Sequence, residues 1–205
     1  MLNPNMMLPK EEAKEYKPFP EDVYAVELLD VNSKEVETYD SKQARKTDTA
    51  LEPVMETVLD FQFVLLEGRD GETNLRGRNI FQNFVPTYLY VSAKGKNKLF
   101  QITEALQSQT LTPKQEAEGI TGADLNAFIG KQCRVGTVNK TSGDKVYSNI
   151  DKFLFAKGDF APLTDKEKEG AQIKPKDDDS VLPDYNDKRA NNDSDMPSPF
   201  SKDNF

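Results

Sequence analysis

Residues 56–85 read ETVLDFQFVLLEGRDGETNLRGRNIFQNFV, and this stretch decides the fold. Between residues 59 and 65 every second side chain is Leu or Phe, which is the period-two pattern of a strand with one buried face. A similar alternation returns over residues 78–85. The segment between the two runs contains an Asp-Gly pair, and glycine supplies the positive φ that a hairpin connection needs. The stretch therefore predicts two antiparallel strands joined by a turn.

The chain before this stretch predicts one more strand and little else. Residues 22–32 are rich in β-branched and aromatic residues, so they predict a strand that could run on to about residue 39. Residues 1–21 hold four prolines and predict an extended lead-in. Residues 40–53 lack a sustained apolar period and end in Pro53, so we expect a long loop or flexible arm. This arm offers three basic side chains to a partner: Lys42, Arg45 and Lys46.

The chain after residue 86 changes period and then changes back. Leu and Ile recur at spacings of three and four, which predicts a helix over about 94–108. A Thr-Pro break at 112–113 follows, and Gly130 ends a short second helix. Residues 131–140 and 145–155 alternate around a Gly-containing turn and predict a closing hairpin.

Three strands, a helical insert and a two-strand hairpin are the element order of the OB-fold, a five-stranded Greek-key barrel. An SH3-like barrel and a ferredoxin-like sheet are the alternatives, although the latter needs a helix after the first strand, where residues 40–53 are a poor candidate. We predict a mainly β chain with an OB-fold domain over 22–160, whose helical insert separates the third and fourth strands. Residues 161–205 are expected to be a disordered acidic tail.

Composition excludes several kinds of chemistry. The chain has 205 residues, with no His, no Trp and one Cys, so a His general base, a His metal site and an internal disulfide are impossible. Cys133 lies in an apolar strand pattern and predicts a small buried side chain. No phosphate-cradling or zinc-protease motif is present, and the acidic clusters fall in segments that we expect to be mobile. We therefore predict no catalytic residue, no metal, no cofactor and no enzymatic activity.

Charge is distributed unevenly along the chain. The net charge is −8, but residues 177–205 alone hold eight Asp against three basic residues. Residues 69–100 and 130–157 each hold six basic residues against two acidic ones. No apolar run is long enough for a signal peptide or a membrane span, so we expect no membrane partner and a cytoplasm-like compartment, the host cytoplasm if the chain is viral.

Cations interleaved with aromatic rings predict a surface for single-stranded nucleic acid, where cations hold phosphates and rings stack on bases. Ordinary loop charge and core-filling aromatics are the alternative reading of the same residues. The main candidates are Arg76, Arg78, Phe81, Arg134, Lys140, Lys145 and Tyr147, together with Lys42, Arg45 and Lys46 from the arm; Tyr88, Tyr90 and Lys152 are further ones. In the tail, Phe200 and the terminal Phe205 could dock in an apolar, basic pocket of a partner, unless the tail serves only solubility.

The order of elements, the charge layout and the tail together resemble single-stranded DNA-binding proteins of the phage or viral replication type. The closing hairpin IGKQCRVGTV, TSGD and KVYSNIDKFL is similar to that of phage proteins of this build. The ending MPSPFSKDNF is similar to the acidic Pro-Phe tip of bacterial single-stranded DNA-binding proteins, but it contains Lys202 and ends in Asp-Asn-Phe. The resemblance implies sequence-independent coating of single-stranded DNA in replication or recombination, with the tail recruiting replication or recombination proteins. A protein-interaction or virion assembly module is the alternative, and the oligomeric state stays open.

Overall fold

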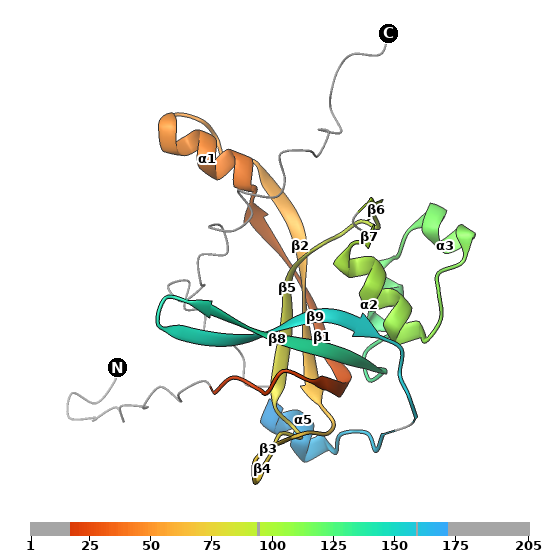
Figure 1. Ribbon diagram of the computed structural model, residues 1–205. Coiled ribbons are helices and arrows are strands. Elements are labelled where there is room, and N and C mark those ends of the chain that lie inside the picture. The colour runs from red at the N-terminus through yellow and green to blue at the C-terminus, as the bar shows by residue number, and fades with distance from the viewer. Residues whose placement is uncertain (1–16, 94, 159, 172–205) are drawn as a thin grey trace, which may run out of the picture.

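The computed structural model describes residues 17–93, 95–158 and 160–171. One antiparallel sheet of five strands dominates it, in the order β5-β2-β1-β8-β9 (Figure 1). The five strands are β1 (Val23–Glu37), β2 (Met55–Leu65), β5 (Asn79–Pro86), β8 (Gln132–Ser142) and β9 (Lys145–Leu154). The predicted pairing of β2 with β5 and the predicted β8–β9 hairpin are both confirmed.

Two small ribbons lie in the connections. β3 (Arg69–Asp70) pairs with β4 (Thr73–Asn74) inside the predicted turn, where Gly71 has a φ of +59°. β6 (Val91–Ser92) pairs with β7 (Gly95–Lys96) just before the helical insert.

The core lies on the face of the sheet that the period-two pattern predicts. Phe61 and Phe63 of β2 are fully buried, and the ring of Phe63 lies 5.6 Å from that of Phe153 on β9. Helix α2 (Lys98–Gln107) closes this core with Leu99, Ile102 and Leu106, as its helical spacing predicts.

The closed barrel that we expected is not found. The edge strands β5 and β9 come near each other, but among the described residues no backbone ladder joins them. A mainly β fold with an antiparallel sheet and a few helices is therefore what the structure establishes.

Two helices correct the sequence prediction. The segment 40–53 is not a long loop, because α1 (Tyr39–Thr47) occupies most of it. The hydroxyl of Thr38 caps this helix by accepting from the N–H of Ser41, and only Ser41 is buried, so no apolar period marks the helix. The Thr-Pro step at 112–113 starts α3 (Pro113–Glu118) instead of merely breaking the chain. The short helix expected before Gly130 is α4 (Gly122–Asn126).

The other face of the sheet is covered by residues that we assigned to the disordered tail. Helix α5 (Asp165–Ala171) packs there, and Leu163 and Ala171 are buried against Ala25, Val64 and Leu66. The prediction of a disordered tail from residue 161 is therefore wrong for residues 161–171. The tail residues Phe200 and Phe205 lie outside the described residues.

Within the described residues, no helix is both long and apolar enough to cross a membrane. The same part of the chain contains no cluster of acidic or thiol side chains suited to a metal ion.

Candidate nucleic-acid interface

The outward face of the β8–β9 hairpin carries four cations and one tyrosine along its length; we call it the hairpin face. Cys133 and Val135 of β8 point into the core, so the even-numbered residues of β8 point outward. The strand register sets Lys140 opposite Tyr147 and Gly136 opposite Lys152. The hairpin face consists of Arg134, Lys140, Lys145, Tyr147 and Lys152.

The turn of this hairpin carries the most accessible cations. Lys140 and Lys145 are exposed on either side of the turn at Gly143, whose φ is +57°. Tyr147 is half-buried; it lies opposite Lys140 across the hairpin and two residues from Lys145 on the same strand. A ring flanked by two lysines can stack on a base while the ammonium groups bind the adjoining phosphates.

The base of the hairpin has a different character. The side chain of Lys152 lies flat over Gly136, where an added Cβ would meet the lysine Cε at 2.8 Å. A shallow pocket beside it is lined by Glu21, Asp22 and Asp151 as well as Lys152. The turn also holds one acidic residue, Asp144, but three acidic residues lie beside Lys152, so the turn is the more cationic end of the hairpin face.

Arg134 lies on the same outward face, but one nitrogen of its guanidinium already has a hydrogen-bond partner. Its Nε donates to the carbonyl of Phe155 at 3.0 Å, which fixes the side chain along the strand. The described contacts leave the terminal guanidinium nitrogens for another acceptor.

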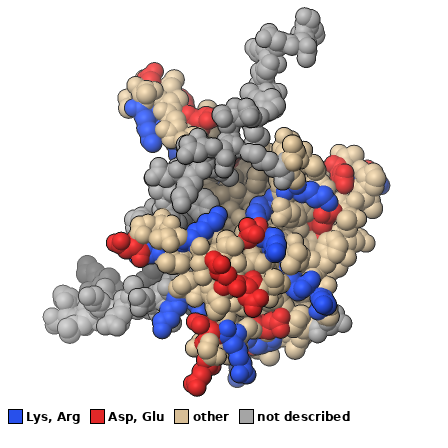
Figure 2. All heavy atoms as spheres, in the orientation of Figure 1, with Lys and Arg blue, Asp and Glu red and all other residues tan. Residues whose placement is uncertain are grey.

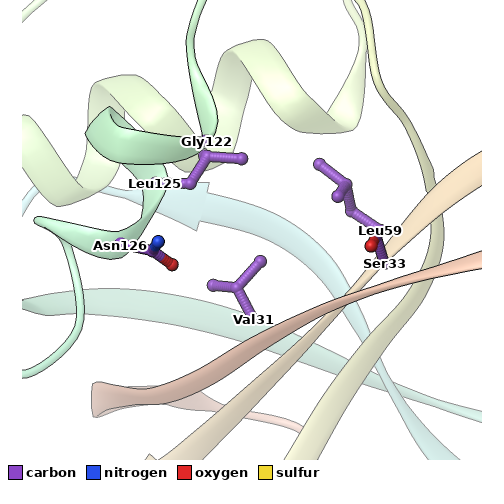
Figure 3. A pocket seen from close by; sticks show the side chains of 6 residues that line it. All are labelled: Val31, Ser33, Leu59, Gly122, Leu125 and Asn126. Atoms are coloured by element: carbon purple, nitrogen blue, oxygen red, sulfur yellow. The ribbon is translucent and has the colours of Figure 1, made fainter.

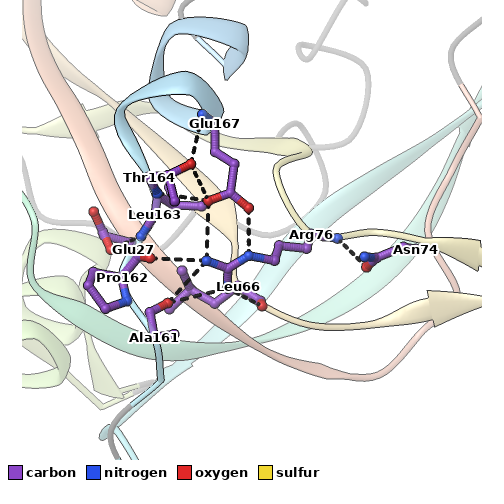
Figure 4. Close-up of polar contacts among 9 residues, drawn as sticks. All are labelled: Glu27, Leu66, Asn74, Arg76, Ala161, Pro162, Leu163, Thr164 and Glu167. Carbon is purple, nitrogen blue, oxygen red and sulfur yellow. Dashed lines mark hydrogen bonds and ion pairs between the residues drawn. The ribbon is translucent and has the colours of Figure 1, made fainter.

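Arg76, which we predicted as a phosphate ligand, instead connects the end of β2 to the segment that contains α5 (Figure 4). Its guanidinium pairs with Glu167 at 2.7 Å and donates to the carbonyls of Leu66, Ala161 and Pro162. Hydrogen bonds from Arg76 and Thr164 lower the pKa of Glu167 to about 2. Binding a phosphate would cost Arg76 these contacts, so it is not part of the interface.

Arg78 also contacts other parts of the protein. Its guanidinium lies 4.4 Å from the centre of the Phe19 ring and donates to the carbonyl of Lys17 at 2.7 Å. These contacts hold the N-terminal lead-in against β5, because Phe19 is buried while Arg78 covers it.

Phe81 is exposed on β5, with 40 % of its surface accessible, and lies opposite Gln62 of β2. It belongs to the same sheet but not to the hairpin face. Its neighbours on this outward surface are amides: Gln62 and Asn79 bond each other, and both donate to the carbonyl of Ala171.

The three basic residues of the predicted arm lie on α1. Lys42 and Lys46 are exposed, whereas Arg45 points back to Glu37 at 3.2 Å. Hydrogen bonds from Ser41 and Arg45 lower the pKa of Glu37. Figure 1 shows α1 and the turn of the β8–β9 hairpin projecting toward the same side of the molecule, at the left of the view.

The two basic stretches of the sequence do not merge into one patch. In the first, Lys96 pairs with Glu104 at 2.7 Å, and Lys98 donates to the carbonyls of Ile150 and Asp151, where burial lowers its pKa. Figure 2 shows Lys and Arg side chains interspersed with Asp and Glu over the visible face. The hairpin face is therefore built almost entirely from the second stretch.

Cys133 is buried, as predicted, and burial raises the pKa of its thiol to about 12. Neither a protein-family model, nor a curated protein, nor a solved structure matches this chain. The candidate site therefore stands on its own geometry. The sequence did not reveal the role of Gly136, although an isolated glycine inside a strand pattern is a known sign of a close approach.

Proposed function

We propose that this protein is a non-catalytic single-stranded DNA-binding protein whose hairpin face binds the sugar-phosphate backbone and stacks on bases. The observation that carries the proposal is the placement of Tyr147 beside Lys140 and Lys145 on one outward surface, with Lys152 and Arg134 farther along the same face. A row of cations that includes an aromatic ring fits a flexible strand, because each base offers a stacking surface and each phosphate offers a charge.

The strand order supports an open OB-like barrel as the scaffold. In OB-folds the second and third strands, with the loops between strands one and two and between strands four and five, bind oligomers. Here these loops correspond to the segment with α1 and to the turn at Gly143, and the second and third strands are β2 and β5. Lys42 and Lys46 would then supply additional phosphate contacts, and Phe81 a second stacking ring.

The test compares nucleic acids by fluorescence anisotropy. Oligo-dT of about 20 nucleotides should bind with a Kd of about micromolar or tighter, and a duplex of equal length should bind more weakly. Tyr147→Ala should weaken binding by about 5- to 150-fold, the equivalent of one lost stacking contact, while Tyr147→Phe retains it. Ile129→Ala is the control, since Ile129 is an apolar side chain that is 45 % exposed outside the hairpin. Equal affinity for duplex, or equal effects of the two alanine variants, would refute the proposed function.

A further inference from the structure

Strand β8 covers only the first part of β1, and no described strand pairs with the outer edge of the remainder. β8 pairs with β1 only over Val23–Glu27, and Leu28 completes the contact through Gly130 and Lys131. Beyond that point, the described contacts pair β1 with β2 alone, along the arm that leads to α1 (Figure 1).

The outward backbone groups of this edge can be assigned. The N–H of Thr38 bonds the carbonyl of Val54, so Thr38 faces β2. Hydrogen-bonding direction alternates along an antiparallel strand, so Ser33, Glu35 and Glu37 direct their N–H and C=O groups away from β2. Such an edge is a template for an additional strand.

A small pocket lies directly beside the edge (Figure 3). Its volume is about 150 Å³, and its lining is Val31, Ser33, Leu59, Gly122, Leu125 and Asn126. An apolar cavity of about this volume holds a benzene ring, so the pocket has room for one aliphatic side chain. Val31 and Ser33 belong to the edge itself, so a side chain opposite Ser33 on an added strand would point toward the pocket.

One charged side chain on this edge, Glu35, has no ion-pair partner among the described residues. Lys34 pairs with Asp60 at 2.6 Å, and Glu37 pairs with Arg45 at 3.2 Å. Glu35 is exposed, and no described residue forms an ion pair with it. Because side chains alternate, Glu35 lies on the same face as Ser33, two residues from the pocket.

We propose that the β1 edge over Val31–Glu37 binds an extended segment of a partner protein by strand addition. The segment carries an aliphatic residue that fills the pocket and a Lys or Arg two residues away that pairs with Glu35. This interface is separate from the hairpin face. A second copy fits less well, since antiparallel pairing centred on Lys34 or Glu35 would oppose identical charges.

The experiment uses the full chain and three short fluorescent Thr-rich peptides. Their centres are Leu-Thr-Lys, Leu-Thr-Glu and Asp-Thr-Lys. We expect the first to bind at least threefold more tightly than the other two. Bound peptide should slow amide exchange at Ser33 and Glu35, whose N–H groups face outward, but not at residues already paired with β2.

Two variants separate recognition from folding. Glu35→Lys should reverse the preference, so that Leu-Thr-Glu becomes the better ligand. Glu56→Lys is the matched control: Glu56 is exposed and pairs with Val36, on the face opposite Glu35, so it should retain the original preference. Ser33→Pro removes one outward N–H and should abolish peptide binding while the circular dichroism spectrum is preserved.

Equal binding of the three peptides, or a preference unchanged by Glu35→Lys, would overturn the proposal. Protection of the Ser33 and Glu35 amides in a dimer without peptide would assign the edge to a second copy. Protection of the same amides by oligo-dT would assign it to the nucleic-acid site. Loss of oligo-dT binding in Tyr147→Ala with retained peptide binding would confirm that the two surfaces are independent.

Discussion

The salt dependence of DNA binding gives the sharpest test of the hairpin face. Neutralising Lys140 and Lys145 together removes two of its four cations, and both side chains are exposed, so the core is unaffected. Each phosphate contact to a single strand contributes about −0.7 to the slope of log K against log salt. The four contacts of the hairpin face contribute about −2.8 to the slope, and the double alanine variant should keep about −1.4 of that contribution, in addition to any contribution from Lys42 and Lys46.

These slopes translate into directly measurable affinities. Between about 50 and 200 mM salt the hairpin face alone accounts for a loss of about 50-fold in affinity for oligo-dT in the parent protein and about 7-fold in the variant, so the parent should lose about 7-fold more than the variant. Anisotropy titrations at four or more salt concentrations would measure both slopes. The matched control neutralises Lys114 and Lys166, which are exposed on α3 and α5, and should leave the parent slope unchanged.

Parallel lines for the parent and the hairpin variant would refute the reasoning, because the two lysines would then release no counterions. An equal reduction in the control variant would mean that overall charge, and not the hairpin face, determines the binding.

Two predictions concern the scaffold. Gly68 has a φ of +128°, and an added Cβ would meet the Tyr24 ring at 2.8 Å, so Gly68→Ala should lower the free energy of unfolding by about 2–5 kcal/mol. Gly143→Ala, at an open turn, should lower it by only about 1 kcal/mol. Urea titrations measure both values, and equal losses would contradict the close contact of Gly68 with Tyr24. Because Arg76 holds the pKa of Glu167 at about 2, below its usual 4.5, the attachment of α5 should be complete above pH 4.5 and weaken as the pH falls toward 2. The protection factors of the α5 amides, which are exchange rates corrected for their intrinsic pH dependence, should therefore fall over that range, and Arg76→Gln should show low protection already at neutral pH. Protection factors that do not change with pH in the parent protein would exclude this role.

The sequence predicts elements well where burial leaves a period. The alternation in β2 and the spacing of three and four in α2 each reflect one buried face, and both elements lie where the patterns indicate. The polar helix α1 has no such face. Its only local signals are the Thr38 cap, Asp40 in the first turn and basic residues in the last turn, which are helix-boundary signals without an apolar stripe.

The start of α5 carried a readable signal too. The Thr164 hydroxyl accepts from the backbone N–H of Glu167, and the Glu167 carboxylate accepts from the backbone N–H of Thr164. This reciprocal pair is the pattern of a capping box. The acidic composition that follows residue 176 obscured it. Only Leu163 and Ala171 give this segment an apolar contact, so a hydropathy reading could not separate it from the tail.

The candidate site was harder to predict because the sequence does not show which cations are already bound. Arg76, Arg78 and Arg134 all lie in basic stretches of the sequence. Arg76 and Arg78, however, bond residues far away in the chain, Glu167 and Lys17. A guanidinium must give up such bonds before it can bind a phosphate, and a typical internal hydrogen bond contributes about 0.5–1.5 kcal/mol. The number of basic residues in a stretch of sequence is therefore the largest number of cations that the stretch can offer to a ligand, and internal contacts reduce it. At the turn end of the β8–β9 hairpin, residues 140–146 are all exposed, and the described contacts give Lys140 and Lys145 no internal acceptor. These two cations therefore stay available because this end of the ribbon lies outside the core.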